Sequence, residues 1–378
     1  MDFAFGDEER RLHERMRELG LRAGEAASPR RLEVLGEGAA LGLSIGREWG
    51  GGGYGLVATA HAYEGLGYAL DDAGVLLAAG AHLFGVAATI EKLGTREQKA
   101  EWLPRLAEGR VLATVAATEE ASGSNVAEVD GTVQAAGGRT AQSEGGGLLR
   151  VRGDKRFVVS AARAGLFLFV GKNLGATSTR PSLSCALVPR TEGVVCEGPY
   201  ALAGLMGAGL ARVRFDLAVD GGAMLGAPGA GMSVFQVAMT FERALVLAFR
   251  LGAMRRELEE SARFVKGRKL GGVALASKQA ATHRLARMKL RLETARSLVY
   301  RAAWELDRGG RAHAEAALAK WHVAEAALES SLDALRLRGG EGYLREHGCA
   351  QRLDDALGGT VHSGTSDVLA DIVAAWLG

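Results

Sequence analysis

Cysteine is scarce in this chain. Three cysteines, Cys185, Cys196 and Cys349, are spread over 378 residues. Their spacing matches no metal-binding motif, and so small an odd number does not support a disulfide framework. A reducing compartment is therefore expected. The N-terminal segment MDFAFGDEERR is acidic where a secretory signal would be basic and then apolar, so the sequence predicts a cytoplasmic protein.

The chain also has almost no net charge. Its 46 Lys and Arg against 44 Asp and Glu give +2, and the basic residues are scattered. This balance offers no electrostatic attraction for nucleic acid or for an anionic membrane. The most lipid-like run, residues 73–90, is interrupted by glycines and by His82, and we interpret it as a buried helix and not as a membrane span. Neither nucleic acid nor a membrane is expected as a partner.

Several catalytic motifs are missing. The chain has no Walker loop, no Rossmann glycine fingerprint after a strand and no nucleophile elbow. No His/Cys/Asp/Glu cluster has metal-ligand spacing, so no metal site is predicted, and His82 and His322 are expected to be core or interface residues. The composition, 48% hydrophobic and 24% charged, is that of an ordinary globular protein.

The chain divides into three parts by its residue pattern. Residues 1–114 and 228–378 carry the 3.6-residue period of helices, while residues 115–227 alternate short segments with glycine and serine turns. Thr95 is well placed to cap the helix that follows it. The predicted architecture is mainly α with a central β domain: an N-terminal helical domain, a middle β domain and a C-terminal helical bundle.

The middle part shows a period of two. Residues 212–217, RVRFDL, alternate apolar side chains with charges, and residues 166–170 and 183–188 are continuously apolar, as in buried strands. Short strands at this spacing predict a compact antiparallel barrel or sandwich. The glycine-rich segment 137–147 is predicted to be a surface hairpin with no chemical role.

The last part contains long helical stretches with short connections. They are expected at 234–266, 276–306, 313–337 and 354–359, with a final helix from Ser366. Short loops favour antiparallel neighbours, which predicts a helix bundle.

Glu242 is the most informative residue of this part. The helical period places it in the middle of an apolar stripe formed by Phe235, Met239, Val246, Phe249 and Ala253. A carboxylate is costly to bury without a partner, and burial raises its pKa toward the range in which a general base works. The alternative is structural: Glu242 could complete an ion pair with Arg243 or Arg250.

Four segments, in order, resemble the acyl-CoA dehydrogenase family. Residues 93–108, LGTREQKAEWLPRLAE, are similar to its "FGTEEQK…LP.LA.G" segment, and residues 118–125, TEEASGSN, to its "TEP.AGSD" loop. Residues 155–165, KRFVVSAARAG, resemble its "K.(W/F)ITN…AD" strand. Residues 338–343, RGGEGY, followed by VHSGTSDV at 361–368, resemble "GG.GY … IYEGTSEI".

The resemblance implies a fold and an activity. The fold is an N-terminal helical domain, a middle antiparallel β-barrel and a C-terminal four-helix bundle, assembled as a homodimer or homotetramer, with FAD between the barrel and the bundles of two subunits. The activity is α,β-dehydrogenation of an acyl thioester, in which a carboxylate removes the α-proton while the β-hydrogen leaves as hydride to the flavin. The acyl group would be carried by CoA or by a carrier protein, and an electron-transfer flavoprotein is a candidate partner.

The resemblance also assigns the base. Most members carry it as the Glu of "YEGT", and here that position is Ser363, which cannot act as a base. The isovaleryl- and long-chain-type branches place it on the preceding helix, at a position that matches Glu242. Arg243 would then support the helix junction and tune the carboxylate.

The resemblance further implies the residues that bind FAD. The residues that would line the flavin are Thr118, Ser124, Phe157 and Ser160. Those that would lie on the pyrophosphate side are Arg268, Gln279, Gly339 and Gly340. Thr365 would contact FAD near the active site.

Some positions depart from the family pattern. The strand threonine is Val159, the proline of "TEP" is Glu120, an aromatic is lost at 270–272, and the Gln that begins the glycine segment is Arg336. Two alternatives therefore stay open beside the dehydrogenase: a flavin-poor or flavin-free structural partner of a true dehydrogenase, and a flavin oxidase or monooxygenase. Residues 64–83 and the "SGT" ending favour a member that serves secondary metabolism.

Overall fold

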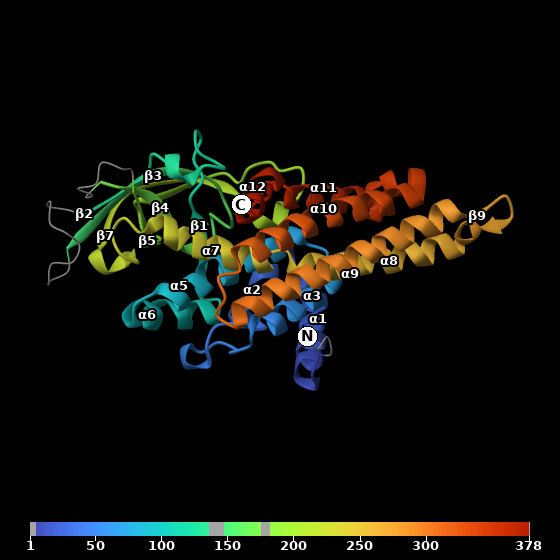
Figure 1. Ribbon diagram of the computed structural model, residues 1–378, viewed down its shortest axis with the longest axis horizontal. Helices are drawn as coiled ribbons and strands as arrows, with labels where there is room; N and C mark the ends of the chain where they lie inside the picture. Colours follow the sequence, from blue (N-terminus) through green and yellow to red (C-terminus); the bar gives the residue numbers. More distant parts are fainter. Residues whose placement is uncertain (1–4, 136–146, 175–181, 378) are drawn as a thin grey trace.

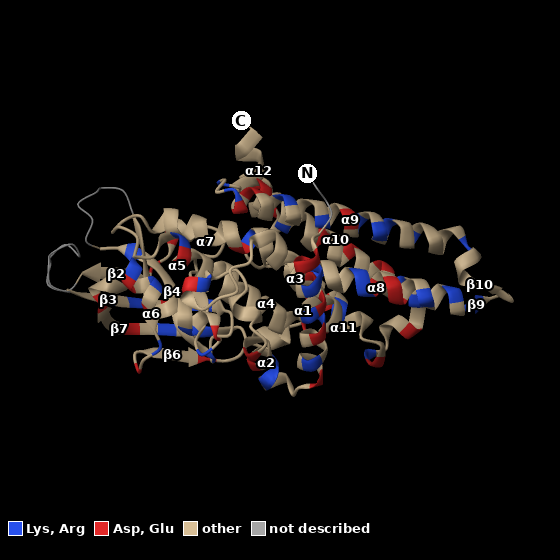
Figure 2. Cartoon of the chain, turned by 90° about the horizontal axis from the view of Figure 1, so that it is seen from below, with Lys and Arg blue, Asp and Glu red and all other residues tan. Residues whose placement is uncertain are grey.

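The computed structural model describes residues 5–135, 147–174 and 182–377. A sheet lies at one end of the molecule, the N-terminal helices lie beside it, and two long helices run out to the opposite end (Figure 1). The predicted hairpin at 137–147 falls, except for its last residue, outside the described residues. Acidic and basic residues are interspersed along the helices (Figure 2).

The N-terminal part is helical. Its helices are α1 (Asp7–Glu25), α2 (Arg31–Glu37), α3 (Leu56–Ala69), α4 (Ala73–Gly80), α5 (Ala88–Leu93) and α6 (Arg96–Ala107), and the segment Ala81–Ala87 between α4 and α5 is a π-helix. Thr95 caps α6 as predicted: its hydroxyl accepts the Gln98 N–H, and the Gln98 side chain accepts the Thr95 N–H.

The middle part forms one eight-stranded sheet. The strands are β1 (Leu112–Ala116), β2 (Thr132–Ala135), β3 (Leu148–Val158), β4 (Ala164–Asn173), β5 (Leu183–Pro189), β6 (Val194–Glu197), β7 (Ala211–Asp220) and β8 (Met224–Leu225). Their order is β6-β7-β3-β2-β4-β5-β8, with β1 also paired to β4. In β7 the apolar Val213 and Phe215 are buried, while the charged Arg214 and Asp216 that follow them are exposed, as the alternation predicted.

The sheet is mixed, and the predicted antiparallel barrel is wrong. Strands β1 and β2 both run parallel to β4 and share one of its edges, β1 along its first part and β2 at its end. In the described residues the path from β6 to β8 does not close. Alternating polar and apolar residues report which face of a strand is buried and not the direction of its neighbour. The pattern could therefore predict the strands but not their parallel pairing.

The last part begins with two helices where one was predicted. Helix α7 (Gly231–Leu245) ends before Val246 and Leu247, and α8 (Ala248–Gly267) begins after them. Neither Pro nor Gly marks this break. Helix α7 lies beside the sheet, while α8 runs away from it (Figure 1). The different packing partners of the two helices explain a break that the residue pattern did not indicate.

The bundle continues to the C-terminus. Its further helices are α9 (Gln279–Asp307), α10 (His313–Arg338), α11 (Cys349–Gly359) and α12 (Ser366–Leu377), and a short hairpin of β9 (Lys269–Leu270) and β10 (Val273–Ala274) joins α8 to α9. Helix α10 packs against α7, α8, α9, α11 and α12 and so forms the centre of this part.

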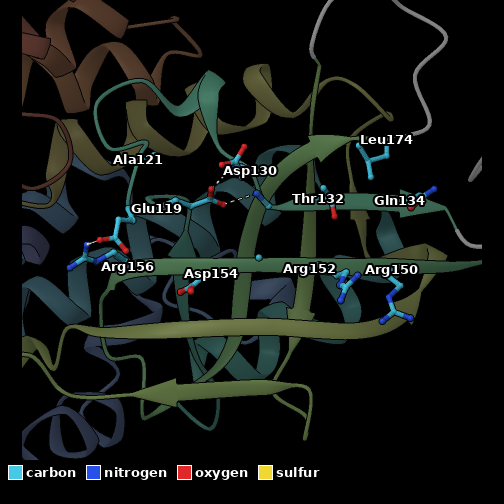
Figure 3. Close-up of a pocket in the computed structure, with 13 residues that line it drawn as sticks. Glu119, Ala121, Asp130, Thr132, Gln134, Arg150, Arg152, Asp154, Arg156 and Leu174 are labelled. Carbon is cyan, nitrogen blue, oxygen red and sulfur yellow. Dashed lines mark hydrogen bonds and ion pairs between the residues drawn. The ribbon is translucent and has the colours of Figure 1, made fainter.

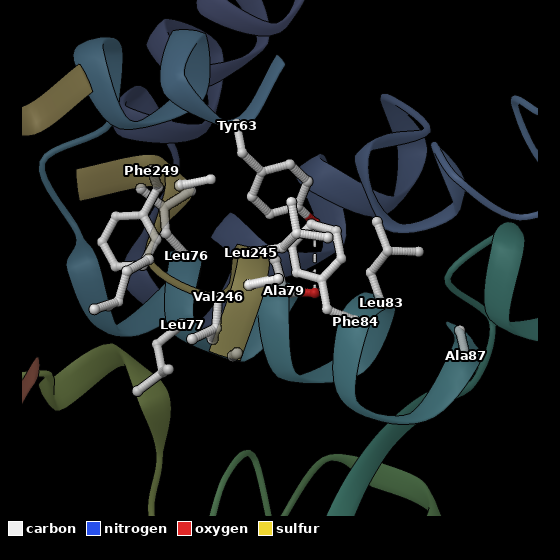
Figure 4. Close-up of a cluster of buried hydrophobic side chains, with 14 of the residues drawn as sticks. Tyr63, Leu76, Leu77, Ala79, Leu83, Phe84, Ala87, Leu245, Val246 and Phe249 are labelled. Carbon is white, nitrogen blue, oxygen red and sulfur yellow. Dashed lines mark hydrogen bonds between the residues drawn. The ribbon is translucent and has the colours of Figure 1, made fainter. Parts of the chain in front are cut away.

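The segment from α4 to α5 lies in the core. Tyr63 and Phe84 are fully buried with ring centroids 5.0 Å apart, beside the junction of α7 and α8 (Figure 4). Helices α3 and α8 approach so closely that a Cβ on Gly67 would lie 1.8 Å from the Phe249 carbonyl oxygen, and one on Gly252 would lie 1.9 Å from the Glu64 carbonyl oxygen. Only glycine allows this contact between the two backbones.

Two stretches are long and apolar enough to cross a membrane by length and composition alone. They are Ala73–Leu93, whose apolar window is 100% buried inside the fold, and Gly231–Gly267, whose window is 61% buried. Core helices pass the same test. The first stretch has the burial predicted for a core helix.

Candidate active site

Glu242 lies near the end of α7, against the π-helical segment Ala81–Ala87. The residue is 7% exposed. A Cβ added to Gly85 would lie 2.6 Å from Glu242 Oε2, so this glycine leaves the space that the carboxylate occupies. On the other side, the Ser363 hydroxyl donates a hydrogen bond to Oε1. The carboxylate therefore fills a narrow slot between a helix and the turn that precedes α12.

Within the described residues Glu242 has no ion-pair partner. The neighbouring Arg243 donates from Nε to the Ser363 carbonyl oxygen at 3.0 Å, and Arg250 donates to the Asp355 carbonyl oxygen. The ion pair with Arg243 or Arg250, which the sequence left open, is therefore not formed. The direct donor to this buried carboxylate is a neutral hydroxyl.

The turn before α12 is held by two cations. Ser363 and Gly364 both have left-handed backbones, with φ of 54° and 96°. Arg243 binds the Ser363 carbonyl, and Lys320 Nζ donates to the Gly364 carbonyl oxygen at 2.6 Å. Thr365 accepts the Val368 N–H at 3.3 Å and so caps α12. Thr365 is the one predicted cofactor residue that lies in this turn.

Burial controls the protonation of these groups. It raises the pKa of Glu242, while the Ser363 hydrogen bond and the charges of Arg243 and Lys320 lower it by smaller amounts. Burial lowers the pKa of Lys320 to about 7. The pKa of His362, whose Nδ1 lies 3.1 Å from Ser363 Oγ, is well below the ordinary value because the ring is buried and Lys320 and Arg250 are near. Glu242 can therefore take up a proton beside a neutral imidazole.

The loop that contains Thr118 and Ser124 is anchored by a buried ion pair. Lys155 on β3 is fully buried, and its Nζ donates to Glu119 Oε1 at 2.6 Å and to the carbonyl oxygens of Ala117 and Val170 at 3.0 and 2.7 Å. Glu119 also accepts the backbone N–H groups of residues 130 and 131. This pair fixes the start of the loop, while Ser124 itself is exposed.

Phe157 and Ser160 lie at the end of β3. Both have left-handed backbones, with φ of 54° and 50°. Phe157 is 51% exposed, and its ring lies 5.3 Å from that of Tyr200. Ser160 is buried and donates its N–H to the Ala208 carbonyl oxygen at 2.7 Å. Since Arg156 donates its N–H to the Thr118 carbonyl oxygen at 2.8 Å, the fold brings these residues beside the Thr118 loop.

The sheet side connects to Glu242 through β1. The Ala113 N–H donates to His82 Nδ1 at 3.0 Å, which ties β1 to the π-helical segment. The Cβ position of Gly85 lies 3.5 Å from the Val115 side chain. Strand β1 then leads directly to Thr118. Within a single subunit, the fold therefore places Glu242 near Thr118, where the predicted flavin loop begins.

The remaining predicted cofactor residues lie far from Glu242. Arg268 follows α8, Gln279 begins α9, and Gly339 and Gly340 follow α10, all at the end of the bundle opposite the sheet (Figure 1). Arg268 is exposed and pairs with Glu341 at 3.3 Å. The chain does not bring this group together with Thr118, Ser124, Phe157 and Ser160.

The residues at both ends fit FAD. At the sheet end, an exposed aromatic ring at Phe157 offers an apolar surface to a flat ring system. At the bundle end, Arg268 offers an exposed guanidinium, and a Cβ added to Gly339 or Gly340 would meet nothing within 4 Å. A forked cation and open backbone suit phosphate oxygens.

A cavity of about 610 Å³ opens elsewhere, on the outer face of β2 and β3 (Figure 3). Its lining includes Glu120, Arg150, Arg152, Asp154 and Arg156 and does not include Glu242. These side chains are largely paired: Arg156 with Glu120 at 3.4 Å, and Arg150 and Arg152 with Asp216 on β7 at 2.7 and 3.2 Å. The cavity is a surface groove whose charged side chains are largely paired. The candidate general base lies instead in the slot at Glu242.

Sequence reasoning missed Lys320, Gly85 and His362. Lys320 stands in the alanine-rich run 314–327, where the helical period places it on the same face as Ala316 and Val323. The argument that singled out Glu242, a lone charge on an apolar face, could have found it. Nothing local in the sequence indicates that Gly85 faces Glu242, because the two residues meet only in the folded chain.

Models of the acyl-CoA dehydrogenase family match the chain in three consecutive segments. The N-terminal domain matches residues 5–110, the middle domain residues 114–218 and the C-terminal domain residues 229–378. The chain belongs to the acyl-CoA dehydrogenase family. The predicted family is confirmed, and with it the predicted class, a flavoprotein oxidoreductase with FAD as its cofactor.

The relatives include proteins that act on a carrier-bound amino acid. An L-prolyl-(peptidyl-carrier protein) dehydrogenase of Pseudomonas fluorescens is 36% identical over 352 residues, which cover 91% of this chain and 89% of the relative. A protein of the same name from a Serratia species is 30% identical over 356 residues, covering 92% and 88%.

Solved structures show the same likeness. The prolyl acyl carrier protein oxidase AnaB superposes with a TM-score of 0.92 at 27% identity, over 99% of this chain and 100% of AnaB. PigA with FAD and proline superposes with a TM-score of 0.91 at 27% identity, over 100% and 99%.

Proposed function

We propose that this chain is an FAD-dependent dehydrogenase that oxidises the α,β-bond of a prolyl group, or of a similarly compact acyl group, held as a thioester on a carrier protein, with Glu242 as the base. The observation that carries the proposal is a buried carboxylate without an ion-pair partner in the described residues, beside the loop that begins at Thr118. The relatives named for prolyl-carrier substrates support the choice of substrate.

The chain's own residues handle the proton. Glu242 would take the α-proton of the thioester, and the slot between Gly85 and Ser363 holds its carboxylate in one orientation. The low exposure of the slot excludes water, which would otherwise compete for the proton. FAD, when bound, supplies the acceptor for the β-hydrogen as hydride. Phe157, Thr118 and Ser160 would hold its ring end.

The assembly that we propose rests on the separation of the two groups of residues expected to bind FAD. Arg268, Gln279, Gly339 and Gly340 lie at the bundle end, far from the residues that would hold the ring. We therefore propose a homodimer in which the bundle end of one chain binds the pyrophosphate of the FAD held by its partner.

The base is tested by Glu242→Gln. The FAD-loaded variant is mixed anaerobically with prolyl-carrier protein, and loss of the oxidised flavin absorbance is followed in a single turnover. Removing a general base is expected to slow this reduction by about 10²- to 10⁴-fold, with FAD still bound. A variant that reduces its flavin at the wild-type rate would refute the assignment.

Glu257→Gln is the matched control. Glu257 on α8 is also buried, has a raised pKa because of burial, and accepts a hydrogen bond from Ser331 Oγ at 2.8 Å. Glu257 therefore shares with Glu242 its burial, its raised pKa and its serine donor, but it lies outside the slot. Flavin reduction in this control should stay at the wild-type rate.

A second candidate is an oxidase, since the AnaB structure belongs to a protein named as one. The two functions share the proton transfer and differ in the electron acceptor. Reoxidation of the substrate-reduced enzyme in air separates them: turnover sustained by oxygen alone identifies an oxidase, while slow reoxidation that an added electron acceptor accelerates identifies a dehydrogenase.

A further inference from the structure

Lys320 is a buried lysine that forms no ion pair with the described residues. It lies on α10, is 1% exposed, and within the described residues has no carboxylate at ion-pair distance. A buried ammonium group is costly unless hydrogen bonds and charges compensate for lost water. Its Nζ donates to the Gly364 carbonyl oxygen at 2.6 Å. This lysine is thus bound to the turn that carries Ser363.

The turn needs outside support. A left-handed backbone is uncommon for a residue other than glycine and persists only where its surroundings hold it. Ser363 has such a backbone, and its hydroxyl reaches Glu242 from there. Its carbonyl is bound by Arg243 from α7, and the next carbonyl is bound by Lys320 from α10. Two helices therefore fix two successive peptide groups of the turn, one each.

The charge of Lys320 also acts on Glu242. The titratable groups that face Lys320 are Glu242 and Arg243 from α7, Glu325 on α10 and His362 in the turn. Glu325 accepts the Ser366 hydroxyl at 2.6 Å. No carboxylate among the described residues contacts the ammonium, so in its protonated form Lys320 favours the ionised form of Glu242.

We propose that Lys320 is a positioning residue for proton transfer to Glu242: with Arg243 it holds the Ser363–Gly364 turn, so that Ser363 stays hydrogen-bonded to a carboxylate that stays ionised. The proposal rests on the role of Glu242 in the proposed function. Lys320 acts through Ser363 and through its charge, and does not touch the substrate.

The test titrates Glu242 directly. In FAD-loaded protein, the infrared carbonyl band of the protonated Glu242 side chain is identified by its absence in Glu242→Gln and is followed against pH. Lys320→Gln keeps a donor for the Gly364 carbonyl but removes the charge, and should raise the titration midpoint by about one pH unit. Lys320→Arg keeps the charge at every pH, and its midpoint should not lie above the wild-type value.

The same variants are compared in single-turnover flavin reduction. The acid limb of the pH profile should move with the infrared midpoint, so that a midpoint raised by one pH unit makes Lys320→Gln about tenfold slower than the wild type on the acid side. Lys289→Gln, an exposed lysine on α9 that is paired with Glu293, is the matched control and should change neither measurement.

The outcomes separate the two proposals. A Lys320→Gln midpoint equal to that of the wild type, or a Lys320→Arg midpoint above it, would overturn the role of Lys320. If prolyl-carrier protein fails to reduce the wild-type flavin while the infrared midpoint still moves in Lys320→Gln, the substrate assignment fails and the role of Lys320 stands. Should Lys320→Gln not fold, the Lys320→Arg titration decides.

Discussion

Two buried sites in this molecule combine a lysine with a glutamate, and they differ in whether the charges meet. Lys155 and Glu119 touch directly, and backbone groups satisfy most of their remaining hydrogen-bonding positions. Lys320 and Glu242 do not touch, and the hydroxyl of Ser363 and the turn around it stand between them. A closed pair stabilises a loop, whereas an open pair leaves a carboxylate that can accept a proton.

The largest effect is expected from breaking the closed pair. Lys155→Met leaves Glu119 buried without its cation, and loss of one partner of a buried pair costs about 3–5 kcal/mol. Urea denaturation of the FAD-saturated protein should show this loss in the free energy of unfolding. The double variant Lys155→Met, Glu119→Gln should recover part of it. A loss below about 1 kcal/mol would show that the two sites do not differ as described.

The next effect concerns the hydroxyl in the open pair. Ser363→Ala removes the donor to Glu242, and a hydrogen bond to a charged group contributes about 1.5–3 kcal/mol, equivalent to a rate about 10- to 150-fold lower on the acid side of the pH profile. A base works only when ionised, so flavin reduction is lost as pH falls through the pKa of Glu242. Without the donor that pKa rises, and the acid limb of the pH profile should move to higher pH.

Ser331→Ala is the control for this limb. It removes the same kind of bond, from Ser331 to Glu257, at a site away from the slot. It should lower stability without moving the pH profile of flavin reduction. An equal shift of the profile in both variants would contradict a special role for Ser363.

The smallest effect is on stability against pH. Burial raises the pKa of Glu242 in the folded state, so its carboxyl contributes stability that is present below the ordinary glutamate pKa and is lost as pH rises through the folded value. Glu242→Gln lacks this dependence. Its free energy of unfolding should therefore gain on the wild type with rising pH, by about 1.4 kcal/mol for every pH unit that separates the folded pKa from the unfolded one. A difference that stays constant across this range would contradict the raised pKa.

The features that could be predicted from the sequence are those that depend on the residues of a single helix or strand. The burial of Glu242 followed from the period of a single helix, and the Thr95 cap from four consecutive residues. The parallel pairing of β1 and β2 with β4 did not, because alternation carries no information on strand direction.

The slot residues around Glu242 could not be predicted because they come from separate segments of the chain. Gly85 and Ser363 meet Glu242 from two segments far apart in the chain, and Lys320 reaches the Ser363–Gly364 turn from a third; no local pattern links them. The family resemblance assigned Ser363 only as a position that lacks a base. The structure adds that its hydroxyl binds the carboxylate that replaces the one expected there.

The π-helical segment Ala81–Ala87 sets a constraint on how this chain can change. A π-helical turn takes in more residues than an α-helical one, so Gly85 faces Glu242 only while the irregular winding persists. Deleting one residue here would let a regular helix run from α4 to α5 and would rotate Phe84 or Val86 toward the carboxylate. The more regular helix would close the slot and would also displace buried core residues such as Phe84. The length of this segment is therefore as much a part of the active site as the identity of its side chains.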